Sequence, residues 1–315
     1  MRVFRNFPYE PVEGTPFEAV TIGVFDGIHC GHQRILERLL ERAAGRPACL
    51  ITFDPHPRAV LGTPQPNRLL TPIEERLEHL SRWPLAATAV LRFDAEMARM
   101  SYEDFAQRIF VAALGAQHLV LGYNVRIGRN REGTPETLAA AGSRLGYGVD
   151  LVAAVSVAGQ IASSTAVRQH LDAGDVEAAA ELLGRPYDLR GAVVRGAGRG
   201  RVLGIPTANL RLHPDKFVPR LGVYAVRVRI AEAPGRVWAG ALNIGLAPTF
   251  APDGPRSVEV HLLGFESDLY GKHLELDLLH RLRDEQRFPS VEALRAQIQA
   301  DLDAVRQRVS VSAAP

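Results

Sequence analysis

The stretch Thr21-Ile-Gly-Val-Phe-Asp-Gly-Ile-His-Cys-Gly-His-Gln33 begins as an apolar strand and passes through a glycine turn. It continues into a segment whose apolar residues, between Ile35 and Leu40, recur at helical spacing. A strand, a turn and a helix start in this order gather free backbone N–H groups where an anion can bind. His29 and His32 lie three residues apart at the helix entry, so both rings can face that anion. The stretch predicts a phosphate site between a buried strand and a helix.

Two other interpretations fit a pair of histidines near a turn. They could form a metal site, or they could be polar residues at a helix cap. The H-x-G-H arrangement resembles the signature of the nucleotidylyltransferase superfamily, whose members attach a nucleotide to a phosphate or carboxylate and release pyrophosphate. The position of the motif, after a strand and before a helix, favours this interpretation over the others.

The composition is that of an ordinary globular chain. Its 315 residues suggest about two domains of roughly 100–200 residues each. A formal net charge of +2 gives no general case for a nucleic-acid partner. Cys30 and Cys49 do not suggest a disulfide framework. The chain shows neither the apolar core of a signal peptide nor an apolar run of ~18 residues, so we expect a cytoplasmic protein that does not bind membranes.

Strands and helices alternate through the first half of the chain. Buried strands are predicted, after the opening one, at Ala48–Phe53, Thr88–Phe93, His118–Gly122 and Val149–Val155. Helices are predicted to begin at Thr71 (as the cap residue), Ser101, Gly133 and Ser163. The alternation indicates an α/β fold with an N-terminal doubly wound parallel sheet, whose ligands bind beyond the carboxyl ends of the strands.

Three loop motifs lie at that edge, and each has a plainer interpretation. His56, within Asp54-Pro-His-Pro57, either faces the histidine pair or belongs to a rigid turn. Ser163-Ser164-Thr165, with Arg168 one turn later, either binds phosphates or only caps a helix. Asn124 is either a turn residue or a ligand for the acceptor substrate.

The pattern changes near residue 185. Short alternating runs at Leu189–Arg195, Val223–Ile230, Val237–Asn243, Ser257–Leu263 and Leu274–His280 predict strands, and an amphipathic helix begins only at Ser290. We therefore predict a small C-terminal antiparallel β-barrel with a terminal helix, and two domains, 1–185 and 186–315. The glycine-rich stretch Arg195–Asn209 lets the backbone approach a phosphate, although a basic RNA-binding segment or a structural loop would also fit it.

Taken in order, these motifs resemble the bacterial bifunctional FAD synthetases over nearly the whole chain. The motifs in the first half are Gly23-x-Phe-Asp-Gly-Ile-His-x-Gly-His32, Thr52-Phe-Asp-Pro-His-Pro57, Arg68-x-Leu-Thr71, Gly122-x-Asn-x-Arg-x-Gly128 and Ser163-Ser-Thr-x-Val-Arg168. Those in the second half are Gly204-Ile-Pro-Thr-Ala-Asn209, Gly222-Val-Tyr224, Asn243-Ile-Gly-x-x-Pro-Thr249, Val258-Glu-Val-His261, Leu269-Tyr-Gly271 and Leu282-Arg-Asp-Glu285. The resemblance implies that the chain phosphorylates riboflavin with ATP to FMN and then adenylylates FMN to FAD.

The resemblance also implies roles for single residues of the first domain. His29 and His32 hold the ATP phosphates, and His56 and Asn124 lie near the FMN phosphate. The implied ATP-binding set comprises Gly23, Phe25, Asp26, Gly27, Gly31, Ser163, Ser164, Thr165 and Arg168.

In the second domain, the resemblance makes Thr207 and Asn209 ligands of Mg²⁺ bound with ATP. Glu259 is the implied general base on the riboflavin 5′-hydroxyl, and Arg283 contacts the flavin. The remaining implied ATP-binding residues are Gly196, Gly198, Gly204 and Pro206. Strand alternation places Glu259 and His261 on one face, which also fits a solvated glutamate.

One departure from the family weakens the expected flavin site. Val125-Arg-Ile-Gly128 stands where the family usually has Phe-Arg-Phe-Gly, and the loss of two rings removes stacking surface. The alternative function is therefore a riboflavin kinase whose first domain only binds nucleotide or flavin. The sequence does not determine the oligomeric state.

Overall fold

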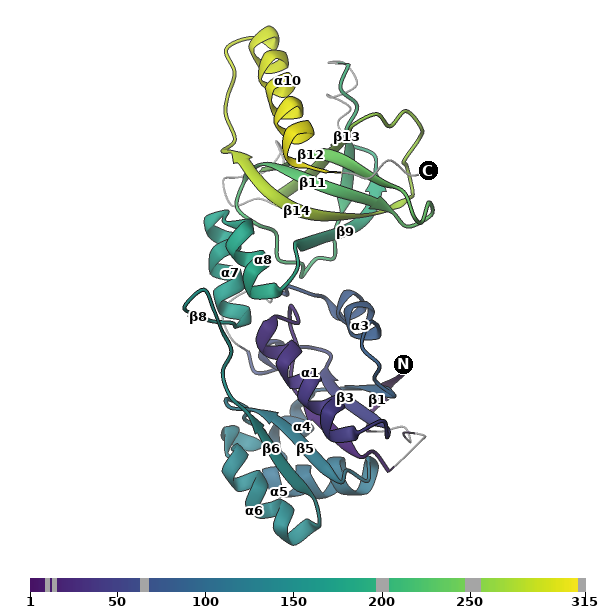
Figure 1. The fold of residues 1–315 in the computed structure, drawn as a ribbon, viewed down its shortest axis with the longest axis vertical. Coiled ribbons are helices and arrows are strands. Elements are labelled where there is room, and N and C mark those ends of the chain that lie inside the picture. The colour runs from purple at the N-terminus through teal and green to yellow at the C-terminus, as the bar shows by residue number, and fades with distance from the viewer. Residues whose placement is uncertain (9–11, 13–15, 63–67, 197–203, 247–255, 311–315) are drawn as a thin grey trace. The chain divides into compact units, whose positions relative to one another are not determined.

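The computed structural model describes residues 1–315 except 9–11, 13–15, 63–67, 197–203, 247–255 and 311–315. The chain divides into two compact units, Met1–Ser164 and Thr165–Pro315, and each is described by itself (Figure 1). No helix among the described residues is both long enough and apolar enough to cross a membrane.

The first unit is built on a six-stranded sheet in which every pairing is parallel, as predicted. The strand order is β1-β4-β3-β2-β5-β6. The strands are β1 (Arg2–Phe7), β2 (Ala19–Ile22), β3 (Ala48–Phe53), β4 (Ala87–Leu91), β5 (His118–Gly122) and β6 (Gly148–Val152). The predicted bounds of β3 and β5 are confirmed, whereas the edge strand β1 was not predicted.

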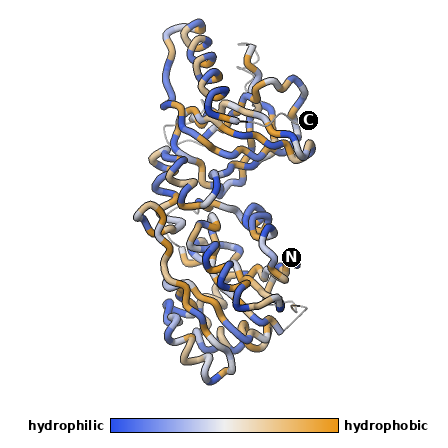
Figure 2. Tube along the Cα trace, viewed as in Figure 1, coloured by the Kyte–Doolittle hydropathy of each residue, from blue (hydrophilic) through white to orange (hydrophobic). Residues whose placement is uncertain are grey.

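Helices follow the strands. They are α1 (Cys30–Ala43), α2 (Pro57–Val60), α3 (Ile73–Ser81), α4 (Ala95–Arg99), α5 (Tyr102–Phe105), a π-helical continuation η1 (Ala106–Ala113), the short η2 (Arg129–Arg131) and α6 (Pro135–Leu145). Two separate apolar clusters form the core, one under α1 with Leu36 and Leu39 and one with Phe110 and Leu138. Apolar segments concentrate on the strands (Figure 2). A sheet covered on both faces explains why every residue of β3 and β4 is buried.

The strand order fixes where a ligand can bind. From β2 the chain proceeds to β3 and β4 on one side, and then returns to place β5 and β6 on the other side of β2. The order in which strands are added to the sheet therefore reverses between β2 and β5. Ligands of such sheets bind beyond the carboxyl ends of the strands at this point. The turn that follows β2 and the turn that carries Asn124 both lie there.

The second unit is a closed barrel of six antiparallel strands, ordered β10-β13-β12-β11-β14-β9. The strands are β9 (Tyr187–Val194), β10 (Ala208–Arg211), β11 (Gly222–Ile230), β12 (Val237–Leu246), β13 (Arg256–Leu262) and β14 (His273–Arg283). The terminal helix α10 (Val291–Arg308) begins at the predicted cap Ser290. This confirms the predicted barrel and helix. Strand β10 was not predicted, because four residues after a glycine-rich stretch are too few to show a period.

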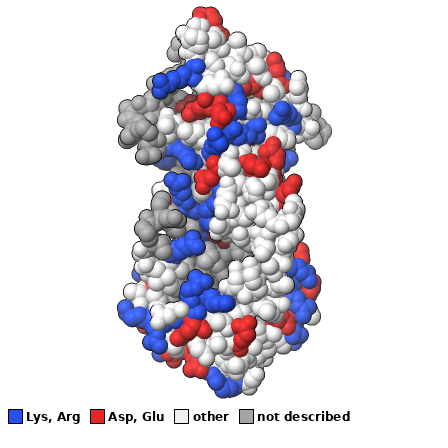
Figure 3. Space-filling view, turned by 90° about the vertical axis from the view of Figure 1, so that its left-hand side faces the viewer, with Lys and Arg blue, Asp and Glu red and all other residues white. Residues whose placement is uncertain are grey.

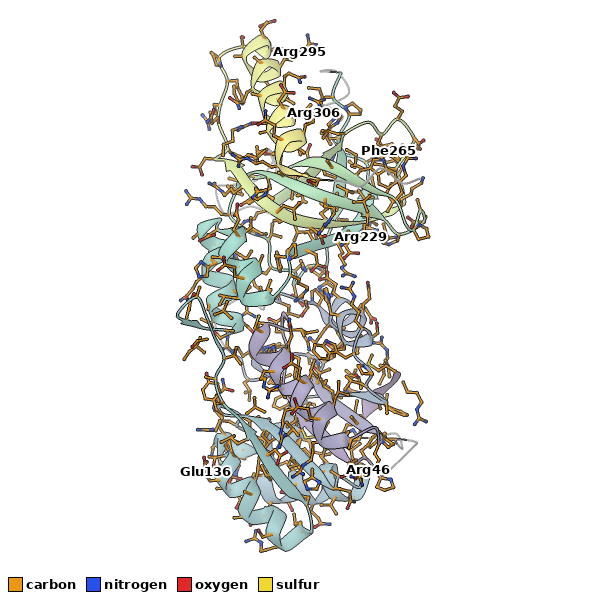
Figure 4. All side chains as sticks on the ribbon, viewed as in Figure 1. Arg46, Glu136, Arg229, Phe265, Arg295 and Arg306 are labelled. Atoms are coloured by element: carbon orange, nitrogen blue, oxygen red, sulfur yellow. The ribbon has the colours of Figure 1, made fainter. Side chains whose placement is uncertain are left out.

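Two helices precede the barrel, α7 (Ser164–Ala173) and α8 (Val176–Leu183). The His280 Nδ1 of β14 lies 3.0 Å from the Glu177 carboxylate of α8. On the outside of the barrel, Arg229 of β11 (Figure 4) pairs with Glu275 and Asp277 of β14 at 2.8 and 2.7 Å. These cross-strand ion pairs raise the pKa of the Arg229 guanidinium. A hairpin, β7 (Ser156–Val157) and β8 (Gln160–Ile161), ends the first unit before α7.

Two candidate active sites

The turn after β2 has an unusual backbone. Phe25, Gly27 and Ile28 have φ values of 54°, 85° and 45°. Phe25 and Ile28 are not glycines and are 1% and 2% exposed, so their left-handed conformation is held by the packing around them. A turn of this kind, at the switch point of the sheet, fixes the direction in which α1 leaves the strand.

Asp26 and Thr71 hold this turn in place. The Asp26 carboxylate, 2% exposed, accepts hydrogen bonds from the backbone N–H groups of Leu70 and Thr71 at 3.2 and 2.9 Å. The Gly27 N–H donates to the Thr71 hydroxyl at 2.8 Å. The predicted helix cap at Thr71 is therefore wrong: Pro72 is the N-cap of α3, because the Thr71 hydroxyl is used across the turn. The predicted contact of Asp26 with ATP stays a prediction.

His29 and His32 come together as the spacing predicted. Their rings stack with centroids 3.7 Å apart and planes 24° apart, and Phe25 lies 4.8 Å from His32 on a tilted plane. His29 is the N-cap residue of α1, but its side chain makes no capping hydrogen bond. The first turn of α1 carries no acidic residue. The N-terminus of α1 thus presents its N–H groups beside two imidazoles, an arrangement that suits an anion.

The electrostatic surroundings keep His32 uncharged. Burial lowers the pKa of His32 well below its usual value, and the nearby His29 and Arg76 lower it further. Among the described residues, the buried Nδ1 of His32 has no hydrogen-bond partner. A neutral imidazole at physiological pH can donate one hydrogen bond and accept another.

The start of α7 and the residues just before it pack against the turn. The Ser164 hydroxyl donates to the backbone carbonyl of Asp26 at 2.8 Å. A Cβ on Gly31 would lie 3.2 Å from the carbonyl oxygen of Ala162 and 3.1 Å from Nδ1 of His29, so glycine permits this approach. The structure therefore brings Ser164, and Ser163 beside it, to the histidine pair. Thr165 and Arg168 lie on α7 in the second unit.

His56 and Asn124 occupy the expected loops. His56 is the N-cap of α2, and its Nδ1 accepts a hydrogen bond from the Arg58 N–H at 3.0 Å. The neutral ring then carries its hydrogen on Nε2. Asn124 is exposed in the turn after β5, at the switch point. The plainer interpretation of His56, a residue of a rigid turn, is compatible with this cap.

The residues that depart from the family pattern belong to the core. Ile127 is 7% exposed within the apolar cluster that contains Phe110, and its backbone pairs with Gly133 in both directions, at 3.0 and 2.9 Å. Val125 packs against the same cluster. The aliphatic side chains therefore fill a core position here, and Arg126 between them is exposed. The sequence predicts the loss of two rings that could stack on flavin. In this structure, the two positions pack into or against the core and do not form an exposed stacking surface.

The second site lies on three neighbouring strands of the barrel. Glu259 of β13 pairs in register with Asn209 of β10 on one side and with Asn243 of β12 on the other. The Thr207 hydroxyl donates to the Glu259 carboxylate at 3.4 Å. The predicted residues Thr207, Asn209 and Glu259 are thus neighbours. Asn243 also belongs to this group, although no role is predicted for it from the sequence. The signal that could have identified it is its place between the buried Leu242 and Ile244.

The segment that follows β9 approaches this site closely. A Cβ on Gly196 would lie 2.2 Å from Nδ2 of Asn209, so any other residue here would force that side chain to move. His261 holds the chain before β10, because its Nδ1 lies 2.8 Å from the carbonyl oxygen of Pro206. Gly204 has a φ of +77° in the same connection. Gly198 lies outside the described residues.

Arg283 has a clear structural partner. Its guanidinium binds the Asp301 carboxylate of α10 in a bidentate manner, from Nε at 3.0 Å and from Nη2 at 2.7 Å. The Arg283 and Asp301 side chains are 16% and 8% exposed. Gln297 also donates to Asp301, at 3.0 Å. Arg283 therefore attaches α10 to the end of β14, and its predicted contact with flavin stays a prediction.

Comparison with known proteins assigns a family to both units. The FAD synthetase family model matches residues 14–166, and the riboflavin kinase family model matches residues 183–309. A bifunctional riboflavin kinase/FMN adenylyltransferase from Pseudomonas fluorescens is 41% identical over 295 residues, 93% of each chain. A relative of the same description from Escherichia coli K12 is 37% identical over 305 residues, 96% of this chain and 95% of the relative. The chain belongs to this bifunctional family.

A solved structure has the same fold over its whole length. It comes from Streptococcus pneumoniae, is described as a macrolide-efflux protein, and is 31% identical with a TM-score of 0.84. The superposition covers 94% of this chain and 98% of that one. Both family models and the bacterial relatives agree on a bifunctional transferase, so the description of that structure does not change the family.

Membership in the family places each candidate site within its matched region. The FAD synthetase match contains the histidine pair and ends just beyond Ser164, and the riboflavin kinase match contains Glu259. The alternative, a kinase with a merely regulatory first domain, is not favoured. ATP-dependent transferases of this kind indicate a divalent metal. Thr207, Asn209 and Glu259 offer hydroxyl, amide and carboxylate oxygens, a donor set that fits a hard cation shared with phosphates.

Proposed function

We propose that the two steps of this bifunctional transferase take place at the two sites described above. The chain phosphorylates riboflavin with ATP to give FMN, and then adenylylates FMN with a second ATP to give FAD and pyrophosphate. The observation that supports the kinase site best is the register of β13, which sets one carboxylate between two asparagines and near a threonine hydroxyl.

At the barrel, Glu259 is the proposed general base. The riboflavin 5′-hydroxyl oxygen forms a bond to the γ-phosphorus of ATP as its proton passes to the Glu259 carboxylate, and the bond from that phosphorus to ADP breaks. Thr207 and Asn209 are the proposed ligands of Mg²⁺, which would neutralise charge on the ATP phosphates when bound. The proposed ATP contacts Gly196, Gly198, Gly204 and Pro206 belong to the segments before β10.

At the first site, no protein nucleophile is required. A phosphate oxygen of FMN forms a bond to the α-phosphorus of ATP, and the bond from that phosphorus to pyrophosphate breaks. His29, His32 and the N–H groups of α1 are proposed to orient the ATP phosphates and to stabilise the charge that develops on them. The proposed pyrophosphate contacts are Ser163, Ser164, Thr165 and Arg168, and the proposed FMN contacts are His56 and Asn124.

The cellular setting is part of the proposal. We propose a cytoplasmic enzyme whose partners are small molecules and neither nucleic acid nor membrane. Neither of its two cysteines forms a disulfide, its net charge is only +2, and basic and acidic side chains are intermixed over much of the face in Figure 3. We also propose a functional boundary near residue 185, close to residue 183, where the riboflavin kinase match begins.

A test separates the two sites within one protein. Glu259→Gln should lower the rate of FMN formation from riboflavin by about 10²–10⁴-fold, the usual contribution of a general base, and should leave FAD formation from supplied FMN intact. Glu266→Gln, an exposed glutamate beyond β13, is the matched control. FMN and FAD are followed separately by chromatography. An unchanged rate of FMN formation in Glu259→Gln would contradict the assignment.

A further inference from the structure

We propose that Arg76 is a positioning residue for adenylyl transfer. It acts as a buried, fixed positive charge that ties together the loops around the histidine pair and keeps His32 available to the phosphates as a neutral ring. The inference rests on the proposed role of the first site. It goes beyond the sequence motifs, none of which includes Arg76.

The guanidinium of Arg76 connects three segments of the chain. Arg76 lies in the first turn of α3, is 1% exposed and is among the largest fully buried side chains. Its Nη1 donates to the Thr52 hydroxyl at 2.9 Å and to the Phe53 carbonyl at 3.2 Å, at the end of β3. Its Nη2 donates to the Thr71 carbonyl at 3.1 Å.

Those contacts extend to the turn that carries the histidines. The Thr52 hydroxyl donates to the backbone carbonyl of Val24 at 2.9 Å. The Thr71 hydroxyl accepts a hydrogen bond from the Gly27 N–H, and the Thr71 N–H donates one to the Asp26 carboxylate. Arg76 is therefore connected, through one intermediate residue on each path, to both sides of the left-handed turn. A shift of the guanidinium would move the turn and, with it, the start of α1.

The charge of Arg76 calls for an explanation beyond these contacts. In the described part of the chain, its hydrogen bonds go to neutral oxygens. Burial lowers the pKa of Arg76, and the carboxylates of Asp26 and Asp54 oppose that effect from a distance. A buried cation without a directly paired anion is costly, and an apolar side chain of similar volume would remove the cost. The charge is therefore expected to act on something nearby.

The positive charge of Arg76 lowers the pKa of His32. Arg76 and His29 are the two charged or titratable groups that lower the pKa of His32 in addition to burial. The same positive charge attracts any phosphate that the stacked rings bind, and its attraction is stronger because the Arg76 guanidinium itself is buried. A neutral ring backed by a buried cation can thus orient phosphate oxygens without being protonated itself.

The rival explanation is that Arg76 only braces the loops. Arg76→Lys keeps the charge but loses the fork that spans Thr52 and Thr71, and Arg76→Gln loses the charge but keeps a donor. If Arg76 only supports the loops, both variants should lose FAD-forming activity to a similar degree, and neither should change its pH dependence. A charge that acts on His32 predicts that only Arg76→Gln changes the pH dependence.

The experiment uses the full-length chain with FMN and ATP, and follows FAD formation between pH 5.5 and 8.5. We expect Arg76→Gln to raise KM for ATP at least about tenfold and to shift the acidic limb of kcat/KM to higher pH. Arg76→Lys should keep the wild-type limb. Phosphorylation of riboflavin by the same preparations reports the folding of the second unit. Arg82→Gln, an exposed arginine at the end of α3, is the matched control.

A second measurement separates this inference from the proposed function. The His32 pKa is measured by NMR in the free protein labelled with ¹⁵N-histidine, with the His32 signal assigned from His32→Asn. The pKa should rise in Arg76→Gln and stay near the wild-type value in Arg76→Lys. Wild-type protein that makes no FAD would refute the proposed function while this titration still tests Arg76. An unmoved His32 pKa in Arg76→Gln, or a raised one in Arg76→Lys, would overturn the inference.

Discussion

The two candidate sites hold their proposed functional groups in different ways. In the first unit these groups lie on turns beyond the strands, and long-range hydrogen bonds from Asp26, Thr71 and Arg76 hold those turns. In the barrel, Glu259 and its neighbours lie on adjacent strands, so the strand register alone brings them together. The first site therefore depends on a buried polar network, and the second depends on register and on clearance around its side chains.

The largest effect expected from this comparison tests clearance at the barrel. Gly196→Ala would place a Cβ 2.2 Å from Nδ2 of Asn209, so the asparagine must move. A misplacement of about 1 Å can cost about 10²-fold in rate, and we expect a loss of that size in riboflavin phosphorylation. FAD formation from supplied FMN should be unaffected. The measurement is kcat/KM for each step.

Gly235→Ala provides the matched control for that substitution. Gly235 has a φ of +87° in the connection between β11 and β12, and a Cβ there would meet no atom within 4 Å. This variant therefore carries the backbone penalty of replacing glycine without a clash at the site. Equal kinase losses in both variants would show that clearance around Asn209 does not matter.

A smaller effect is expected at the buried ion pair of the barrel, which, unlike Arg76 in the first unit, sets a cation directly against an anion. Arg283→Met would leave the Asp301 carboxylate buried without its cation, and we expect the second unit to lose about 3 kcal/mol of unfolding free energy. The double variant Arg283→Met/Asp301→Leu should recover most of it. Denaturant unfolding followed by Trp238 fluorescence, in a Trp83→Phe background, measures both.

An exposed ion pair on α10 is the control for the Arg283 and Asp301 variants. Arg306 (Figure 4) binds Asp303 on α10, and both side chains are more than half exposed. Arg306→Met should leave the unfolding free energy unchanged within error.

The Arg283 and Asp301 variants also test the proposed flavin role of Arg283. A double variant that recovers stability but has a raised KM for riboflavin would support a contact with flavin, and an unchanged KM would argue against it.

The contrast between the sites also explains what could be predicted from the sequence. The motif order of the resemblance was enough to name the residues of the barrel site. Asn209 and Glu259 meet through regular pairing, and Thr207, just before β10, reaches Glu259 through its hydroxyl. The motif was also enough for the histidine pair, since helical spacing is local. Short or edge elements such as β10 and β1 escaped detection, because they carry too few residues to show a period.

The polar network of the first site could not be predicted. Thr71 before a proline fits a helix cap by local rules, yet its hydroxyl binds a turn more than forty residues earlier in the chain. Arg76 follows two glutamates on a helix, a pattern typical of a solvated face, and is nevertheless buried. Contacts between distant segments carry no periodic signal, so a site built from them becomes visible only in the structure.

The smallest expected effect tests the burial of His32. Its folded pKa is depressed, whereas an unfolded histidine titrates near 6.5. Above about pH 6.5 both states are neutral and His32 adds no pH dependence. Below it the unfolded state binds a proton that the folded state rejects, so the unfolding free energy falls as pH falls, by up to about 1.4 kcal/mol per pH unit. Unfolding of the first unit between pH 7.5 and 5.5, followed by Trp83 in a Trp238→Phe background, should show this slope, and His32→Asn should flatten it. An equally steep slope in His32→Asn would mean that the stability of this unit does not depend on a neutral His32.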